Sequence, residues 1–463
     1  MKRLDSYDLF AGLDVHTPLK EDVVIWLGLR PGDYKSISYA YPNGVASTRF
    51  GKDTINTARK FAFVSVEQNT RTRTDSDLEE LSPYLLEFLK RFNGNRVHIV
   101  AYHSTPSLER VVSSMPNVRI LNSPAALKSK LDKKSYVRRE LQKIGVPFPL
   151  GHEETLESES YQGAASEYSL PFFVQFNDAA SGSGSFLVNN WGDFKDIFEK
   201  FRGEQAIFMK YINGSSFNMN LVRTNNFTVL SEPSFQIIGA SGCTTRRFGY
   251  CGNDFNIESK VSEEELRAID SIALKVGDWI GSQGYRGIFG IDFISDGKKV
   301  YFTEINPRFQ GSTALLTDQH LEIGKLPLTL FHLVPFLDDV SIKPESLTEY
   351  NLQRNKISAS QILVHNTLGR DCIMQSSLAP GRYELVDGRL LYQGPGEVLS
   401  DSISTKEIVI AGEIPLDGTR VLRDSDEMYK IFSYKEVLDR SGKGLNKEGR
   451  ALVEAVNSRM RLQ

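Results

Sequence analysis

The chain has 463 residues, of which 40% are hydrophobic and 24% charged, and its formal net charge is −3. This composition is ordinary for a globular protein, and the length suits about two to four domains. The charge argues against nucleic acid as a partner, because a phosphate backbone requires a basic surface.

Three features bear on the compartment. The first residues lack the apolar core of roughly 7 to 15 residues that defines a secretory leader. No run approaches the roughly 20 apolar residues of a membrane span. Cys243, Cys251 and Cys372 form neither a Cys-x-x-Cys pair nor an even disulfide framework, which is typical of a reducing compartment. We therefore expect a cytoplasmic protein without a membrane partner.

The first part of the chain alternates between strand-like and helix-like runs. Leucines recur at helical spacing between Asp77 and Phe92, which predicts a helix. The alternation favours an open, largely parallel α/β sheet in an amino-terminal domain of residues 1–125. Gly28 to Gly32 can form a loop at the carboxyl edge of this sheet, but it lacks a dinucleotide-binding pattern. The predicted strands are 23–29, 61–66, 97–102 and 118–121.

The run Leu131 to Tyr136 is predicted to open a helix that continues to Lys143 and stops at Gly145, before Pro147. A lysine in the first turn is at the unfavourable end of the helix dipole. Lys133 therefore needs another reason to be there, although a solvated surface lysine is the alternative.

The next segment predicts two strands joined by a loop of small residues. The first strand, 171–176, contains Gln175, and the second ends at Val188. Backbone N–H groups of the loop between them can wrap phosphates because no side chain blocks their approach. A plain flexible hairpin is the alternative. The candidates in the loop are Ser181, Gly182, Ser183 and Gly184.

Residues 206–212 predict a further strand and a hinge, followed by strands 217–223 and 227–230. The polar segment from Ser241 to Asp254 has no strong periodicity and suits a substrate-facing loop, with Arg246 as its catalytic candidate. A solvated connector is the alternative. The polar residues of this segment are Arg246, Arg247, Tyr250, Asn253 and Asp254.

After a predicted core helix, 263–283, two apolar runs flank a Ser-Asp-Gly turn and predict a β-hairpin. Asp292 is the only charged residue of its first strand. Glu304 and Asn306 share one face of the second strand, close to the position opposite Asp292. Such oxygen ligands suit Mg²⁺ or Mn²⁺. Arg308 follows one pleat later and can bind a carboxylate or phosphate through two hydrogen bonds. A hairpin with merely solvated carboxylates is the alternative.

The last part of the chain, residues 346–463, predicts a β-rich extension. Glycine and proline separate its apolar runs. The seven histidines of the whole chain do not cluster with Cys or acidic residues at metal-ligand spacing, so a zinc site is not expected. The predicted strands are 357–364, 382–392, 397–399 and 408–410.

The sequences Gly-Ile-Asp-Phe at 290–293 and Phe-Thr-Glu-Ile-Asn-Pro-Arg at 302–308 resemble the metal-binding end of the ATP-grasp superfamily. The resemblance implies an α/β protein with the ATP-grasp fold: the amino-terminal α/β domain, a lid of residues 126–212, a metal and substrate subdomain of residues 213–345, and the extension. It further implies that Asp292, Glu304 and Asn306 hold Mg²⁺ ions that bridge the phosphates of ATP.

The resemblance also implies a nucleotide site. Lys133 would contact the phosphates, with Lys134 as the second choice, and the Gly/Ser loop would cover them. Two positions depart from the family: Gln175 replaces its usual lysine, and Met209 its usual glutamate. The adenine edge would meet Met209, Lys210 and Ile212, and the ribose candidates are Ser216 and Asn218.

Members of the superfamily activate a carboxylate as an acylphosphate and pass it to a nucleophile. Gln175 and the runs 250–254 and 306–313 look most similar to peptide or amino-acid ligases of natural-product and antibiotic biosynthesis. We therefore expect peptide or amide bond formation between small molecules, with catalytic roles for Arg308, Lys133 and Arg246. Two alternatives stay open: thioester formation with an acyl carrier protein as partner, and a nucleotide-binding protein without catalysis. A homodimer is also open.

Overall fold

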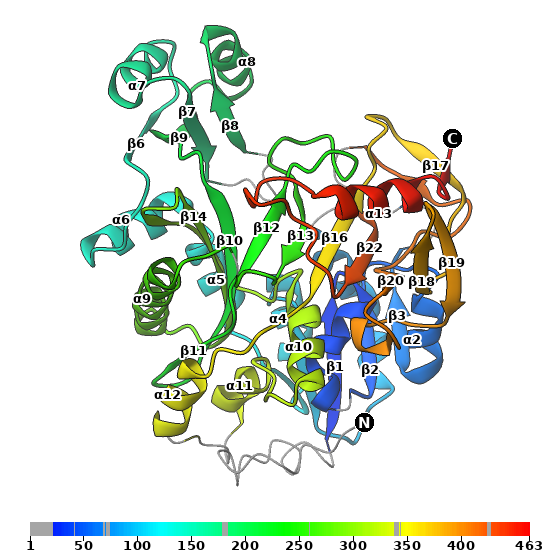
Figure 1. Ribbon diagram of the computed structural model, residues 1–463. Helices are drawn as coiled ribbons and strands as arrows, with labels where there is room; N and C mark the ends of the chain where they lie inside the picture. Colours follow the sequence, from blue (N-terminus) through cyan, green and yellow to red (C-terminus); the bar gives the residue numbers. More distant parts are fainter. Residues whose placement is uncertain are drawn as a thin grey trace.

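The computed structural model describes residues 22–40, 42–67, 70, 75–177, 184–258, 260–337, 342, 344–423 and 427–463. Figure 1 shows a small lid standing apart from a larger body, in which a long central sheet lies beside the amino-terminal domain. Within the described ranges, no helix is long and apolar enough to cross a membrane.

The amino-terminal domain contains a parallel sheet with the order β3-β2-β1-β4-β5, which confirms the open α/β sheet expected from the sequence. Strand β1 is buried along its whole length, as a central parallel strand should be. The strands are β1 Val23–Gly28, β2 Gly44–Ser47, β3 Ala62–Ser65, β4 Val97–Ala101 and β5 Val118–Ile120. The helices are α2 Thr54–Lys60, α3 Ser82–Lys90, α4 Pro106–Ser113 and α5 Ala125–Leu131, with 3-10 helices Pro31–Ala40 and Asp75–Leu81.

The lid has an antiparallel sheet of its own, with the order β6-β9-β7-β8. A separate core that includes Phe172, Phe194 and Phe208 fills the space between this sheet and its helices. The lid can therefore hold its shape independently of the body. Its strands are β6 Gly151–Thr155, β7 Phe172–Phe176, β8 Ser185–Val188 and β9 Gln205–Lys210; α6 Lys134–Lys143 leads into it, and α7 Ser160–Tyr168 and α8 Trp191–Phe201 cover it.

The body is organised around a long sheet that begins with the order β15-β14-β10-β12-β13. Helix α9 packs against it and starts with a capping box, in which Ser262 and Glu265 satisfy each other's backbone N–H groups. The strands are β10 Ser215–Arg223, β11 Thr228–Leu230, β12 Ser234–Ile238, β13 Tyr250–Asp254, β14 Gly287–Ser295 and β15 Val300–Asn306. The helices are α9 Glu263–Ser282, α10 Thr313–Glu322, α11 Leu330–Leu333 and α12 Pro344–Leu352, with a 3-10 helix Val334–Phe336.

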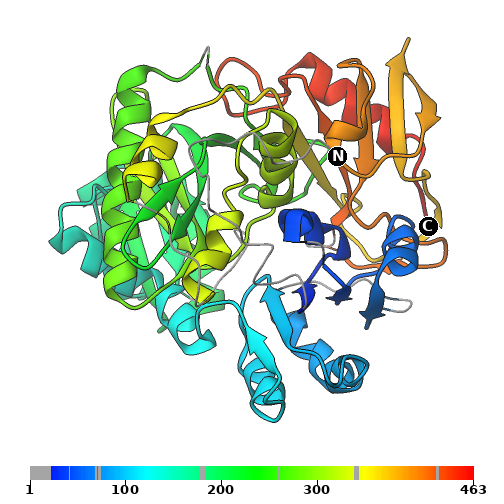
Figure 2. The ribbon, with the colours of Figure 1, turned by 90° about the horizontal axis from the view of Figure 1, so that it is seen from below.

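The carboxyl-terminal part is β-rich, as expected, and its strands continue the same sheet. Strand β16 pairs with β13, and the order then runs β22-β20-β18-β19. Figure 2 shows this part and the central sheet both lying against the amino-terminal domain. Its strands are β16 Ser360–His365, β17 Cys372–Ser376, β18 Gly381–Val386, β19 Arg389–Gly394, β20 Glu407–Ala411, β21 Arg420–Val421, β22 Glu427–Ser433 and β23 Arg461–Leu462; its helices are α13 Lys447–Asn457 and the 3-10 helix Leu399–Asp401.

Two strand predictions in this part are wrong in detail. Residues 382–392 form a hairpin rather than one strand, because Asp387 and Gly388 take positive φ angles and turn the chain. Residues 397–399 lead into the 3-10 helix, since the Asp401 carboxylate accepts hydrogen bonds from the N–H groups of Glu397 and Val398.

An aromatic contact joins the amino-terminal domain to the segment that follows the β14–β15 hairpin, which we call the metal hairpin after its predicted ligands. Trp26 of β1 is fully buried and meets Phe309 edge to face, with ring centroids 5.1 Å apart. The Phe309 N–H also donates to the Tyr102 carbonyl, at 3.1 Å. Such an aromatic pair contributes about 0.5–1.5 kcal/mol beyond its buried area. It fixes the position of Arg308, the neighbouring residue.

Candidate active site

The hairpin of β14 and β15 brings the three predicted metal ligands together. Asp292 lies directly opposite Glu304, and Gly290 opposite Asn306. A bulge follows, because Phe293 pairs with Phe302 and leaves one extra residue on β15. Residues that face each other across antiparallel strands point to the same side of the sheet. Their role as ligands stays a prediction, but the oxygen atoms share one face.

Amide groups surround the Asp292 carboxylate. It accepts hydrogen bonds from Asn218 at 2.6 Å, Gln236 at 3.1 Å and Asn306 at 3.2 Å. Burial and the nearby charge of Glu304 raise the pKa of Asp292 to about 6, although these amides oppose the shift. Amides carry no charge, so the two facing carboxylates repel each other and favour a bound cation.

This donor set fits Mg²⁺ or Mn²⁺. Two carboxylates and the amide oxygen of Asn306 are hard ligands, and Glu304 keeps 35% of its side chain exposed toward an incoming group. Among the described residues no group of three or more His, Cys, Asp and Glu side chains gathers as a metal site. The hairpin pair is thus suited to a cation that takes its remaining ligands from water and substrate.

The two consecutive lysines have different surroundings. Helix α6 begins at Lys134, so the prediction that Lys133 lies in the first turn is wrong; Lys133 is the N-cap residue and is exposed. The side chain of Lys134 is only 9% exposed, and its ammonium lies 3.3 Å from a Glu304 carboxylate oxygen. The structure therefore places Lys134, the second choice from the sequence, at the metal hairpin, and the phosphate role of Lys133 stays a prediction.

The predicted phosphate loop belongs to the lid. Gln175 on β7 donates a hydrogen bond to the Ser185 hydroxyl at 3.3 Å, and the Gly184 carbonyl accepts one from Phe176 N–H. Ser181, Gly182 and Ser183 lie outside the described residues. Gln175 and Gly184 therefore sit at the mouth of the predicted loop, and their contact with phosphate stays a prediction.

The predicted adenine residues lie where the lid joins the body. Met209 is buried in β9 between its sheet partners Gly151 and Phe173. Lys210 ends that strand with an exposed side chain, and its N–H already donates to the Leu150 carbonyl at 2.7 Å. Ile212 lies in the link to β10, where its carbonyl accepts from Gly214 N–H.

Of the two ribose candidates, only Ser216 keeps a suitable position. It is half-buried on β10, opposite Ile294. Asn218 is 2% exposed, and its amide group donates to Asp292 and to the side-chain oxygen of Gln310. The suggestion of Asn218 for ribose is therefore wrong: this residue orients the Asp292 carboxylate instead.

The polar segment from Ser241 to Asp254 is only partly a loop. Its last residues form β13, where Asp254 is buried and accepts hydrogen bonds from the N–H groups of Val437 and Leu438. The prediction that Asp254 faces substrate is wrong, because its carboxylate holds two parts of the body together. Tyr250 donates to Asn253 and accepts from Gln361, which also ties the strand to β16.

Arg246 is half-buried and lies in the loop part of this segment. With Arg247 and Phe248 it borders a cleft of about 490 Å³, and Ser185 and Asp193 of the lid line the other side. Arg246 therefore faces the lid from the body, and its catalytic role stays a prediction.

Arg308 reaches the amino-terminal domain. Its guanidinium donates to the Tyr102 hydroxyl at 2.6 Å and to the Phe309 carbonyl at 3.1 Å, and it lies over the Tyr102 ring. Tyr102 directly follows β4, at the carboxyl end where parallel sheets bind ligands. The sequence analysis did not identify Tyr102, although its place at the carboxyl end of a predicted parallel strand could have indicated a ligand-binding role. It also missed Gln310 and Gln236, and Gln236 has no local signal at all.

Comparisons with known proteins agree with this arrangement. Residues 131–312 match the family model of the ATP-grasp domain. Formate-dependent phosphoribosylglycinamide formyltransferase from Prochlorococcus marinus is 24% identical over 300 residues, which are 60% of this chain and 66% of that protein, just under two thirds of its length.

Solved structures show the same fold at low sequence identity. The biotin carboxylase domain of the Hydrogenobacter thermophilus 2-oxoglutarate carboxylase, in complex with MgADP, ADP and bicarbonate, has a TM-score of 0.58 at 13% identity; the match covers 89% of this chain and 85% of that one. Phosphoribosylamine–glycine ligase from Thermotoga maritima has a TM-score of 0.54 at 14% identity, over 95% and 98% of the two chains. The chain therefore has the ATP-grasp fold and contains an ATP-grasp domain at residues 131–312.

Proposed function

We propose that this protein is an ATP-dependent, ADP-forming ligase that activates the carboxylate of an amino acid or peptide as an acylphosphate and joins it to an amine. The observation that carries the proposal is the convergence of Asp292, Glu304 and Asn306 on one face of the hairpin, with Lys134 3.3 Å from Glu304. The relatives support ATP as the phosphoryl donor, since one of them is bound to MgADP.

The metal hairpin would hold the phosphate end of ATP. Asp292, Glu304 and Asn306 would ligate Mg²⁺ or Mn²⁺, which when bound neutralises phosphate charge and acts as a Lewis acid. Lys134 adds a positive charge at the same face. Asn218 and Gln236 fix the orientation of the Asp292 carboxylate, so the site is organised before the nucleotide arrives.

Arg308 would position the acid. Its guanidinium is held by Tyr102 between the hairpin and the carboxyl edge of the amino-terminal sheet. A carboxylate bound there lies beside the phosphate end and can attack the γ-phosphorus in line. ADP leaves as the new oxygen–phosphorus bond forms. The amine then attacks the acyl carbon, phosphate leaves, and the amine loses a proton.

The test is ADP release from ATP and Mg²⁺ with a panel of amino acids and peptides, each with and without a second amine and with hydroxylamine as a trap. The proposal expects ADP together with a hydroxamate for at least one acid, and amide when an amine replaces hydroxylamine. Glu304→Gln should slow formation of both products by about 10²–10³-fold, while Glu384→Gln, on strand β18, should leave them unchanged.

Other outcomes would identify the alternatives. Turnover that requires an acyl carrier protein would favour thioester formation. Nucleotide binding without ADP release under every condition would overturn the ligase proposal in favour of a non-catalytic binder.

A further inference from the structure

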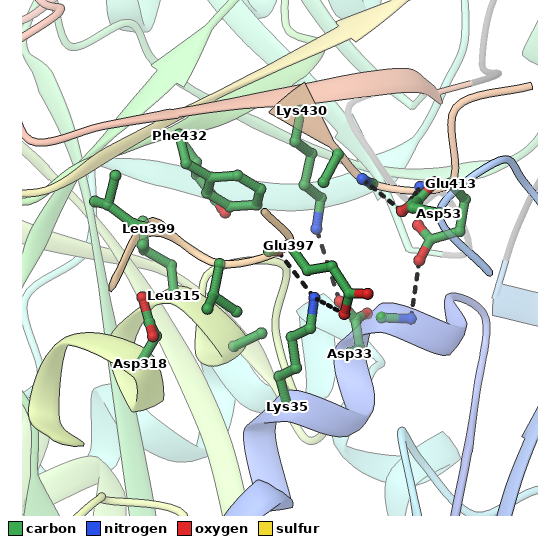
Figure 3. A pocket seen from close by; sticks show the side chains of 16 residues that line it. Asp33, Lys35, Asp53, Leu315, Asp318, Glu397, Leu399, Glu413, Lys430 and Phe432 are labelled. Atoms are coloured by element: carbon green, nitrogen blue, oxygen red, sulfur yellow. Dashed lines mark hydrogen bonds and ion pairs between the residues drawn. The ribbon is translucent and has the colours of Figure 1, made fainter. Parts of the chain in front are cut away.

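A second polar cavity lies where the amino-terminal domain, α10 and the carboxyl-terminal strands meet. Its volume is about 40 Å³, enough for a small group rather than for a nucleotide. Figure 3 shows Glu413 and Asp53 on one side of it and Asp318 on the other. Two lysines, Lys35 and Lys430, also line it. The carboxylates of its lining outnumber them: Asp33, Asp53, Asp318, Glu397 and Glu413.

Most of these carboxylates have partners within the fold. Asp33 pairs with Arg30 at 3.1 Å and with Lys430 at 3.7 Å. Glu397 pairs with Lys35 at 3.4 Å. Asp318 accepts hydrogen bonds from the N–H and hydroxyl groups of Ser400. Glu413 differs from these three, because one of its two oxygens has no donor among the described residues.

Glu413 is 1% exposed and presents an unused acceptor. Its Oε1 accepts a hydrogen bond from Gly32 N–H at 2.9 Å, whereas its Oε2 has no hydrogen-bond partner among the residues that the structure describes. The residue holds a left-handed backbone with φ of 60°, which a glutamate rarely adopts. Asp53 maintains this conformation by accepting the N–H groups of residues 412–414.

Gln361 lines the same cavity and presents a second unused acceptor. It is 1% exposed, and its amide nitrogen donates to the Tyr250 hydroxyl and to the Gly311 carbonyl, both at 3.0 Å. Its Oε1 has no partner in the described part of the chain. Gly311 follows Arg308 by three residues, so Gln361 links this cavity to the proposed acid site.

Two buried acceptors without donors destabilise the fold unless a ligand satisfies them. We infer that the cavity is a recognition subsite for a primary ammonium group of the substrate, which donates to Glu413 Oε2, while Gln361 Oε1 offers a further acceptor in the same cavity. An ammonium supplies three N–H donors and the positive charge that the excess of carboxylates requires. Leu315, Leu399 and Phe432 offer apolar contacts to its carbon atoms.

This inference rests on the proposed function only where it assigns the ammonium to the substrate of that ligase. The group has two possible sources, a small free amine or the α-amino group of an amino acid. Both present the same charge and the same donors, so binding experiments must separate them.

The experiment measures binding of methylammonium and of glycine to the full chain by calorimetry, without ATP. Tetramethylammonium, which has no N–H donor, and methanol, which has no charge, serve as comparison probes. We expect the two ammonium probes to bind, and tetramethylammonium and methanol to bind at least tenfold more weakly. Tighter binding of glycine than of methylammonium would identify an amino acid as the source, and the reverse a free amine.

Glu413→Gln should weaken ammonium binding at least tenfold, whereas the same change at Glu384 should not alter it. Gln361→Leu provides a second variant if Glu413→Gln does not fold, and it should weaken binding in the same direction. Equal binding to wild type and both variants, equal binding of tetramethylammonium, or no binding of either ammonium probe would overturn the inference.

The outcome is separable from that of the proposed function. Hydroxamate formation without ammonium binding would overturn the subsite and leave the ligase standing. Ammonium binding without ADP release would overturn the ligase and leave an ammonium site that serves another activity.

Discussion

Two carboxylates, the half-buried Asp292 and the buried Glu427, have opposite surroundings. Glu427 accepts two hydrogen bonds of 2.6 Å from Arg30 and one of 2.5 Å from Arg49. Burial alone would raise its pKa, but the two guanidinium groups hold the pKa well below its ordinary value. Asp292 receives only amides and faces Glu304, and its pKa rises to about 6. A carboxylate whose charge is balanced by two guanidinium groups stabilises the fold. A carboxylate that receives only neutral amides is available for a ligand.

The largest expected effect is the loss of stability when Glu427, the carboxylate held by two guanidinium groups, is replaced. Glu427→Ala would leave Arg30 and Arg49 buried without their anion, so the free energy of unfolding should fall by about 3–5 kcal/mol. Urea denaturation measures the change. Glu448→Ala, which removes a partly exposed partner of Lys435, is the matched control and should change little. A loss below about 1 kcal/mol for Glu427→Ala would contradict the structural role.

Replacement of Glu304, at the proposed metal site, should show the opposite pattern, with a large effect on turnover and little effect on stability. Glu304→Gln removes one charge from the proposed metal site, so the rate of ADP release should fall by about 10²–10³-fold. The free energy of unfolding should stay nearly constant, or rise, because repulsion of Asp292 is relieved. Parallel measurements of turnover and urea denaturation test both parts, and unfolding of the variant would mean that Glu304 is structural.

Glu413 adds a third carboxylate to the comparison, and its contribution to stability should depend on pH. Burial, followed by the charges of Asp53 and Asp33, raises its pKa to about 7, against an ordinary value of 4.5, while Lys430 and Arg30 act in the opposite direction. The folded state therefore holds the proton more tightly than the unfolded state. Stability should fall as pH rises from 4.5 to about 7, by about 3 kcal/mol.

The predicted dependence of stability on pH is tested by comparing the free energies of unfolding at pH 5 and pH 8. Glu413→Gln should lose less stability than wild type over this interval, because its amide does not ionise. Glu384→Gln should retain the wild-type dependence. Identical dependence in all three proteins would show that Glu413 does not titrate as described.

The smallest expected effect is on kcat/KM for ATP when one of the two neighbouring lysines, Lys133 or Lys134, is replaced. Lys134→Met should lower kcat/KM for ATP by about tenfold, which corresponds to about 1.4 kcal/mol. Lys133→Met should have a much smaller effect, since that side chain is exposed. Steady-state kinetics of both variants decide between them, and the reverse ranking would restore Lys133 as the phosphate lysine.

Short-range patterns account for what the sequence predicted well. The turn between the apolar runs determines the register of the metal hairpin, so Asp292 could be placed near Glu304 from spacing alone. The parallel amino-terminal sheet also follows from local alternation of apolar runs, whereas the lid was implied by the resemblance to a known family. Spacing cannot distinguish Lys133 from Lys134, because one residue of shift in the helix start decides which side chain turns inward.

Contacts between distant segments were not predictable in this way. Asp254 looked like a loop residue, yet its partners are the N–H groups of Val437 and Leu438, far along the chain. The ammonium cavity likewise combines Gly32 with Glu413 across the interface between two parts of the molecule. Nothing in the local sequence of either segment specifies its partner.

The shared sheet has a consequence for how the chain can be shortened. Strand β13 is an inner strand because β16 covers its hydrogen-bonding edge. A chain that ended before β16 would expose that edge to other molecules, and open edges of this kind promote aggregation. The carboxyl-terminal strands thus protect the solubility of the catalytic half, and we expect truncated expression products to accumulate as inclusion bodies.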